Sequence, residues 1–344
     1  MPNVSLCEQE NEVHYNPWTY ADAYLTFVAK ENGTFTFTPR NSNVISYSTD
    51  GGETWTQGNS VSVNSGDKVM WKGTMTPQEY EGIGRFSATG NFDIQGNMMS
   101  LLYGDNYKGQ TDLTGKNFAF YSLFYGNTKV INTENLSLPA TTLAEFCYNN
   151  MFSGCASLIT AAVLPATTLA NVCYSSMFQN CTSLVNAPEL PAETLAGSCY
   201  SYMFQGCTSL TTAPKLPATT LASWCYGYMF NRCTNLTTTP ELPAITLEAR
   251  CYINMFNGCT SLITAPELPA ITLVDYCYNG MFQNCTNLNY IKAMFTTTPS
   301  TSYTNNWVSG VASSGTFVKN SAATWTTTGA NGIPSGWTVE TANE

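Results

Sequence analysis

Residues 199–207 read Cys-Tyr-Ser-Tyr-Met-Phe-Gln-Gly-Cys, and this pattern returns every 26 residues along the middle of the chain. Its two cysteine positions account for twelve of the thirteen cysteines. The first series is Cys147, Cys173, Cys199, Cys225, Cys251 and Cys277, and the second is Cys155, Cys181, Cys207, Cys233, Cys259 and Cys285. Fixed periods of about 20–29 residues are typical of leucine-rich repeats. The spacing therefore predicts a stack of similar units.

Other residues keep the same register and define six full units with a degenerate unit before them. A Leu-Pro pair recurs from residues 138–139 to 268–269, and a Met-Phe pair from 151–152 to 281–282. In the degenerate unit, residues 123–127 replace the Met-Phe-x-x-Cys segment. Atypical terminal units are expected, because the ends of a repeat stack need a different outer face.

Near-constant positions within a unit lie four residues apart. Cys199, Met203 and Cys207 form one such set, and Tyr200 with Phe204 forms another. Residues at i and i+4 share one face of an α-helix. We therefore expect a helix in each unit, with one buried and one solvent face, followed by a short extended rung. The expected fold class is an α/β solenoid, a leucine-rich repeat of 26-residue units with an N-terminal all-β sandwich-like domain and a C-terminal cap.

Threonine recurs in the extended part of the units, and stacked threonines on adjacent rungs can hydrogen-bond across strands. The predicted ladder comprises Thr142, Thr168, Thr194, Thr220, Thr246 and Thr272. Proline cannot donate to a strand ladder. The prolines at Pro188, Pro214, Pro240 and Pro266 therefore limit each strand to a few residues.

The spacing Phe-x-x-Cys-x-x-Leu followed by Leu-Pro resembles the BspA-like (Treponema-type) class of bacterial leucine-rich repeats. The fuller set, Leu-Pro-Ala-Thr-Thr-Leu with Cys-Tyr-x-x-Met-Phe and Cys-Thr-Ser-Leu, is similar to surface proteins of gut Bacteroidales and proteins of their phages. The resemblance covers residues 111–292. It implies an adhesin or recognition module that is extracellular, on the bacterial cell surface or on a phage virion.

The paired cysteines invite a disulfide or metal interpretation, but the predicted geometry argues against both. Two cysteines eight residues apart on a helix, such as Cys199 and Cys207, are separated by about 12 Å, whereas a disulfide needs Cα atoms within about 7 Å. Zinc sites favour closer ligand pairs, often with histidine, and the one histidine is His14. We expect free buried thiols, with no metal and no cofactor.

The composition changes on both sides of the repeats. We expect an N-terminal extension at 1–21, a small β domain at 22–105, the repeats at 106–292 and a cap at 293–344. Alternating polar and apolar residues predict strands at 24–28, 34–38, 44–47, 60–63 and 68–72. In the cap, 305–308 suggests a short helix and 315–319 a strand. Trp325 and Trp337 are expected to cover the open end of the stack.

Residues 48–55, Ser-Thr-Asp-Gly-Gly-Glu-Thr-Trp, match the Asp-box pattern and resemble hairpin turns of sialidase propellers. Sialidases carry several copies and a cluster of arginines that clamps a carboxylate. This chain has one copy and four scattered arginines. We therefore expect a structural turn and no sialidase activity.

Charged residues make up 10 % of the chain, and the formal net charge is −10. Binding to a phosphate backbone requires clustered Lys and Arg, so we expect no nucleic-acid partner. No apolar run approaches the ~20 residues of a spanning helix, so direct membrane insertion is not expected either. Residues 1–8 lack the basic and apolar regions of a signal peptide. We therefore expect either a mature or recombinant form or a route out of the cell that needs no signal, and assembly into a virion is one such route.

An enzyme needs a nucleophile with its base, a carboxylate pair or a metal cluster. The chain has one histidine, and Glu189, Glu241 and Glu267 recur 26 or 52 residues apart in a row that also contains Lys215. A row of this kind is typical of a solvated surface. The sequence therefore predicts a protein that is not an enzyme.

Large side chains at variable positions of the predicted helices are the candidate binding residues, because aromatic and Arg side chains commonly anchor interfaces. They are Phe146, Tyr202, Trp224, Tyr228, Arg250 and Tyr276. The expected partner is a surface glycan or protein of a host or bacterial cell, or another virion protein. The alternative surface is the rung face with Asn186, Thr212, Thr238 and Thr264. The alternative function is a structural virion decoration or fibre protein of a Bacteroidales phage with no ligand of its own.

Overall fold

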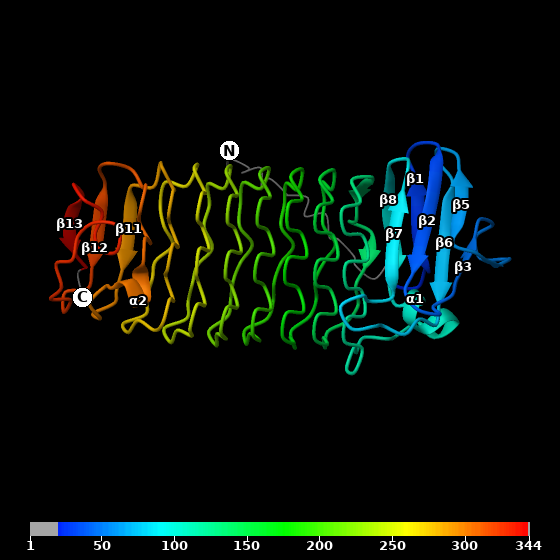
Figure 1. Cartoon of the computed structure of the whole chain (residues 1–344), viewed down its shortest axis with the longest axis horizontal. Helices are drawn as coiled ribbons and strands as arrows, with labels where there is room; N and C mark the ends of the chain where they lie inside the picture. The colour runs from blue at the N-terminus through cyan, green and yellow to red at the C-terminus, as the bar shows by residue number, and fades with distance from the viewer. Residues whose placement is uncertain (1–19, 343–344) are drawn as a thin grey trace, which may run out of the picture.

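The computed structural model describes residues 20–342 of an elongated molecule. A β-rich domain lies at one end, stacked coils of chain form the middle, and three short strands lie at the other end (Figure 1). Two sequence-based expectations concern residues 1–19, which lie outside the described part. They are most of the N-terminal extension at 1–21 and the missing signal peptide.

Eight strands form the N-terminal domain, and two more from the repeats join it. The strands are β1 Leu25–Ala29, β2 Gly33–Pro39, β3 Ile45–Ser48, β4 Thr56–Gln57, β5 Ser60–Val63, β6 Lys68–Gly73, β7 Gly84–Ala88, β8 Phe92–Asn97, β9 Val130–Asn132 and β10 Leu136–Ser137. One sheet has the order β10-β8-β1-β6-β3-β4 with β9 also paired to β8, and the other has the order β5-β2-β7. The five predicted strands are confirmed as β1, β2, β3, β5 and β6. The sequence-based prediction omits β7 and β8, although Phe92-Asp93-Ile94-Gln95 of β8 also alternates.

Aromatic side chains fill the space between the two sheets and continue into the first repeat unit. Phe27 on β1 meets Phe35 on β2 with ring centroids 5.4 Å apart. The same ring lies 5.8 Å from Phe124, which belongs to the degenerate unit. Strands β9 and β10 also pair in parallel with β8. The N-terminal domain and the stack therefore share one core.

The Asp-box segment forms the turn between β3 and β4, as predicted. The Asp50 carboxylate accepts hydrogen bonds from the Ser48 hydroxyl at 2.6 Å and from the Thr54 backbone N–H at 3.0 Å. These hydrogen bonds hold the pKa of Asp50 below its usual range. The turn places Trp55 against Lys72, whose ammonium lies 4.1 Å from the ring centroid. The motif therefore has a structural role.

The repeats contain no helix, so the expected α/β solenoid is wrong. The structure is 3 % helical and 22 % strand. Within residues 20–342 the helices are α1 Ser100–Tyr103, the 3-10 turn η1 Gly104–Asn106 and α2 Thr301–Thr304, all outside residues 111–292. None is long and apolar enough to cross a membrane. Residues four positions apart lie on one face of an α-helix and also on one side of consecutive turns, so the recurrence of the near-constant residues fits both structures.

The segment from first to second cysteine folds instead into consecutive turns with two alternating kinds of backbone hydrogen bond. In the first kind, an N–H donates to the carbonyl three residues back, as Ser201 does to Ser198 at 3.2 Å. In the second kind, the N–H of the following residue donates to a carbonyl of the next unit, as Tyr202 does to Gly227 at 2.8 Å. The backbone N–H groups of successive residues therefore alternate between hydrogen bonds within the turn and hydrogen bonds to the next unit.

Every fourth residue of this segment has a φ between 51° and 78°, in the left-handed region that L-residues rarely adopt. These residues form three turn columns along the stack, and we term this side the turn face. The first turn column is Phe118, Phe146, Val172, Ser198, Trp224, Arg250 and Tyr276. The second is Ser122, Asn150, Ser176, Tyr202, Tyr228, Asn254 and Gly280. The third is Gly126, Gly154, Asn180, Gly206, Arg232, Gly258 and Asn284.

Identical rings stack on one another inside the coils. The tyrosines that follow the first-series cysteines are buried, with neighbouring ring centroids 5.5–5.9 Å apart. The phenylalanines of the Met-Phe pairs are also buried, with centroids 5.6–5.8 Å apart. All these ring pairs lie within 12° of parallel. Equal spacing of equal rings explains why these positions hardly vary.

Isolated parallel bridges join the extended parts of neighbouring units. One ladder runs through Asn132, Thr160, Asn186, Thr212 and Thr238. The predicted threonine ladder is confirmed at two steps, Thr142 with Thr168 and Thr194 with Thr220. Single bridges of this kind follow from the prolines, which interrupt each strand.

The C-terminal segment adds three parallel strands to the end of the stack. They are β11 Tyr290–Ala293, β12 Thr316–Lys319 and β13 Thr338–Thr341. Strand β12 confirms the strand predicted at 315–319, whereas α2 ends just before the helix predicted at 305–308. Trp325 and Trp337 are both buried, and Trp325 stacks on Phe295 at 5.2 Å. The two tryptophans therefore belong to the core of this end.

Val172 allows a test of the backbone conformation. A β-branched residue at its φ of 60° costs about 1 kcal/mol, whereas asparagine tolerates this region. Val172→Asn is therefore expected to raise the unfolding midpoint by a few degrees in differential scanning calorimetry. The control is Val185→Asn, because Val185 is also partly exposed but has no positive φ. A lower midpoint for Val172→Asn alone would contradict the assignment.

Candidate functional site

All six residues predicted to bind a partner lie on the turn face, each with a positive φ. Phe146, Trp224, Arg250 and Tyr276 belong to the first turn column, and Tyr202 and Tyr228 belong to the second. Tyr276 is exposed, and the other five are half-buried. The variable positions therefore do point outward, although consecutive turns present them in place of helices.

Five of the six meet in one group, which we term the aromatic–arginine cluster: Tyr202, Tyr228, Trp224, Arg250 and Tyr276. The rings of Tyr202 and Tyr228 stack at 4.7 Å, and Tyr228 lies 6.4 Å from Trp224 within 11° of parallel. The Arg250 guanidinium carbon is 5.5 Å from the Trp224 ring centroid and 5.0 Å from that of Tyr276. Because these three residues follow one another in the first turn column, Arg250 lies between two rings.

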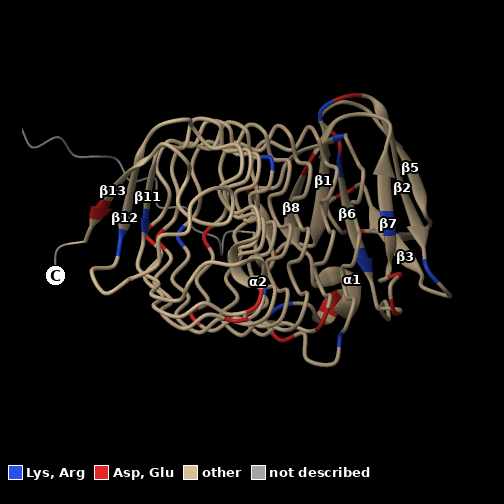
Figure 2. Cartoon of the chain, turned by 60° about the vertical axis from the view of Figure 1, so that its left-hand side comes forward, with Lys and Arg blue, Asp and Glu red and all other residues tan. Residues whose placement is uncertain are grey.

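Arg250 has no anionic partner within residues 20–342, where neither an ion pair nor a hydrogen bond engages its guanidinium. Rings over a guanidinium cover its faces and leave its in-plane N–H groups able to donate. Burial, followed by the neighbouring Tyr228, raises the pKa of Tyr202 and keeps its hydroxyl protonated. The cluster can therefore donate hydrogen bonds to the oxygen atoms of a partner. Figure 2 shows that charged residues are sparse along the rest of the stack.

Comparison with known proteins does not identify a family. No protein-family model, no curated protein and no solved structure matches the chain. The similarity of its repeats to BspA-like proteins stays a prediction.

Phe146 lies apart from the aromatic–arginine cluster, beside the N-terminal domain. Its ring stacks on Phe118 at 4.7 Å. Tyr80, from the segment between β6 and β7, lies 4.9 Å from Phe118 and 5.9 Å from Phe146. Sequence reasoning does not find these two neighbours, because Phe118 is 28 residues from Phe146 in the degenerate unit and Tyr80 lies in another domain.

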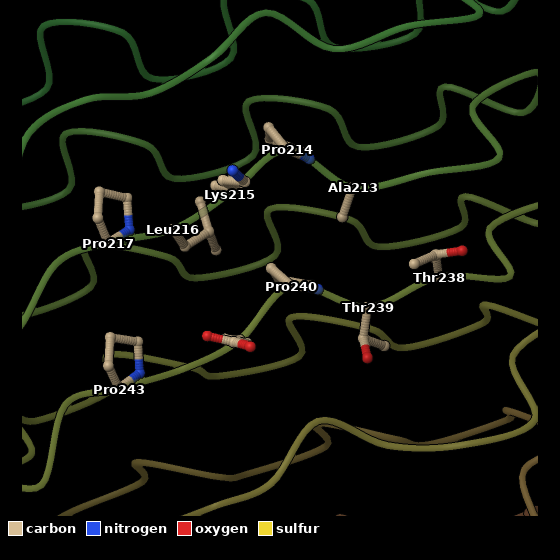
Figure 3. Close-up of a pocket in the computed structure, with 10 residues that line it drawn as sticks. Ala213, Pro214, Lys215, Leu216, Pro217, Thr238, Thr239, Pro240 and Pro243 are labelled. Atoms are coloured by element: carbon tan, nitrogen blue, oxygen red, sulfur yellow. The ribbon is translucent and has the colours of Figure 1, made fainter. Parts of the chain in front are cut away.

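A groove of about 550 Å³ lies on another side of the stack, between two units (Figure 3). Prolines line it at equivalent places of both units, together with Lys215, Glu241 and Thr238 of the alternative rung face. Its prolines are Pro214, Pro217, Pro240 and Pro243. The prolines and Leu216 make most of this lining apolar, so the groove brings together few polar groups. It is therefore a weaker candidate than the cluster.

The twelve cysteines of the repeats are free and buried, as predicted. Second-series thiols donate to a phenylalanine carbonyl of the preceding unit, as Cys207 does to Phe178 at 3.1 Å. Burial raises the pKa of the Cys173 and Cys233 thiols to about 12. No group of three His, Cys, Asp or Glu side chains in the described part of the chain could hold a metal ion. The arrangement indicates packing, not thiol chemistry.

The raised thiol pKa values predict that the repeat cysteines do not react in the native protein. A Cys7→Ser variant removes the one cysteine outside the repeats. We expect no reaction of this variant with an aromatic disulfide reagent at pH 8, and reaction of all twelve thiols after unfolding in guanidinium. Rapid reaction of any native thiol would show that the stack opens or that the thiol is exposed.

Alkaline pH should destabilise the fold. The ordinary pKa of a thiol is about 9, whereas burial raises the pKa of native Cys173 to about 12. A raised native pKa favours the protonated form, so this contribution is complete below about pH 9 and is lost as the pH rises toward 12. The urea concentration at the unfolding midpoint is expected to fall between pH 9 and 11. A midpoint that stays constant over this range would contradict burial of the thiols.

Proposed function

We propose that the chain is a non-enzymatic recognition protein that binds a surface glycan or protein through the aromatic–arginine cluster. It acts outside the cell, on a bacterial surface or on a phage virion. The BspA-like resemblance of residues 111–292 supports this location and this class of function.

The main support for the proposal is the type of residue found at the positions with positive φ. Glycine and asparagine adopt this conformation at the least cost, and they occupy six of the seven positions of the third turn column. The first turn column has the same backbone conformation but contains neither. Its large side chains cost about 1 kcal/mol each, and the turn itself does not require them. Their presence supports a surface that is kept for contact with a partner.

The chemistry of the cluster supports the same proposal. Aromatic and Arg side chains supply most of the binding energy in many interfaces. Here the rings provide apolar area, and Arg250 provides N–H donors that have no acceptor among the described residues 20–342. Sugar hydroxyls and backbone carbonyls of a protein both supply the matching oxygen acceptors. A glycan or protein surface therefore fits the cluster better than an apolar small molecule does.

Binding to cells tests this function. Labelled protein is applied to intact gut Bacteroidales cells and, in parallel, to surfaces coated with mucin or extracellular matrix. We expect saturable binding to one of them, and a loss of about tenfold in affinity for Trp224→Ala and Tyr228→Ala. Arg232→Ala is the matched control, because Arg232 is an exposed third-column residue of the same unit.

Each outcome of the cell-binding experiment has a distinct meaning. Binding to bacterial cells would support a phage recognition module, and binding to mucin or matrix would support a bacterial adhesin. Binding that the two cluster variants leave unchanged would remove the cluster from the proposal. Binding to none of the surfaces would contradict recognition and favour a structural virion protein.

A further inference from the structure

A hollow of about 490 Å³ lies where the N-terminal domain meets the first two units of the stack. Residues 76, 77, 79 and 80 line one side of it, and residues 115–118 with 145–146 line the other. Its volume is within the range of small-ligand sites, about 300–1,000 Å³. None of the residues of the aromatic–arginine cluster lines it.

The loop that forms one wall is held at both ends. The Asn43 side chain donates to the Thr76 carbonyl at 3.0 Å and accepts from the Thr76 N–H at 2.9 Å. Farther along, Gln78 and Gly82 exchange backbone hydrogen bonds at 3.0 and 2.9 Å. A Cβ on Gly82 would lie 2.9 Å from the Tyr121 carbonyl oxygen, so the loop packs closely on the first unit. The hollow is therefore formed before a ligand arrives, which lowers the entropic cost of binding.

Three aromatic residues of the hollow adopt the costly backbone conformation. Their φ angles are 55° for Tyr80, 60° for Phe118 and 56° for Phe146. Phe118 is buried and contacts both other rings, whereas Tyr80 is 61 % exposed. Strained residues persist where the surrounding structure holds them and often mark functional sites. The two phenylalanines thus support an exposed tyrosine ring at the rim.

The charged groups of the hollow determine which ligand fits. Glu79, Glu145 and Lys116 line it, and none of them forms an ion pair within residues 20–342. The Glu145 carboxylate accepts one hydrogen bond, from the Asn171 side chain, and the Lys116 ammonium lies 5.6 Å from the Tyr103 ring centroid, so both keep further hydrogen-bonding capacity. An anionic ligand would meet two carboxylates, and a cationic ligand would meet an ammonium group. A hydroxyl group can donate to a carboxylate and accept from an ammonium. A neutral ligand with several hydroxyls therefore satisfies all three side chains.

We propose that the hollow binds a neutral sugar unit. The Tyr80 ring contacts the apolar C–H face of the sugar, and Glu79, Glu145 and Lys116 hydrogen-bond to its hydroxyls. This site goes beyond the proposed function, because it uses other residues, another part of the stack and a ligand of defined class. Either proposal can fail while the other holds.

Titration of the full chain with small sugars tests the proposal. Glucose, galactose, mannose, fucose and N-acetylglucosamine serve as neutral probes, with glucuronate as the anionic and glucosamine as the cationic counterpart. Saturation-transfer NMR and calorimetry are expected to show saturable binding of at least one neutral probe. The dissociation constant should rise about tenfold in Tyr80→Ala, and both charged counterparts should bind more weakly than the neutral sugar.

Two control variants separate the hollow from the rest of the surface. Tyr125→Ala removes a second exposed tyrosine, which belongs to the degenerate unit, and Trp224→Ala removes a ring of the aromatic–arginine cluster. Both should keep the sugar affinity, and Tyr80→Ala should keep the unfolding midpoint because Tyr80 is exposed. The proposal is overturned if no neutral probe binds, if Tyr80→Ala binds as the unaltered chain does, or if a charged counterpart binds best. Loss of sugar binding in Trp224→Ala alone would place the sugar in the cluster and also overturn it.

Discussion

The stack depends on a backbone that turns back on itself every four residues. In each unit, half of the N–H groups of this segment donate within the turn and the other half donate to the next unit. Buried backbone donors without partners are costly, so a unit is complete only when its neighbour is present. The two ends meet the same requirement differently. The last full unit donates to the C-terminal segment, from Tyr276 to Ser302 and from Asn284 to Ser309, while Leu123 of the degenerate unit accepts from Phe86.

This stacking also determines the interior. Because each unit lies directly over the last, a tyrosine meets a tyrosine and a phenylalanine meets a phenylalanine at nearly constant spacing. A cysteine is small enough to lie beside these rings, and its thiol gives a buried phenylalanine carbonyl a second donor, as between Cys233 and Phe204. Twelve cysteines therefore have a packing role that needs neither oxidation nor a metal.

On the surface of the stack, the positions with positive φ differ in the side chains that they carry. In the third turn column it is occupied mostly by glycine and asparagine, as the backbone alone would favour. In the first turn column it carries rings and an arginine, which gather at two places along the stack. One place is the aromatic–arginine cluster, where Arg250 lies between Trp224 and Tyr276. The other is the hollow beside Tyr80, where residues 76, 77, 79 and 80 of the N-terminal domain form one wall.

Several features follow from the sequence alone, because each depends on residues that are close in the chain or in equal register. They are the 26-residue period, the buried thiols, five strands of the N-terminal domain and the outward position of Phe146, Trp224 and Arg250. It could not separate consecutive turns from a helix, since residues i and i+4 lie on one side in both, and the difference resides in φ at positions such as Tyr202. The degenerate unit was also out of register, which hid Phe118. The position of Phe146 beside Tyr80, apart from the other five candidate residues, could not be predicted, because the packing of the N-terminal domain on the stack brings together residues that no repeat relates.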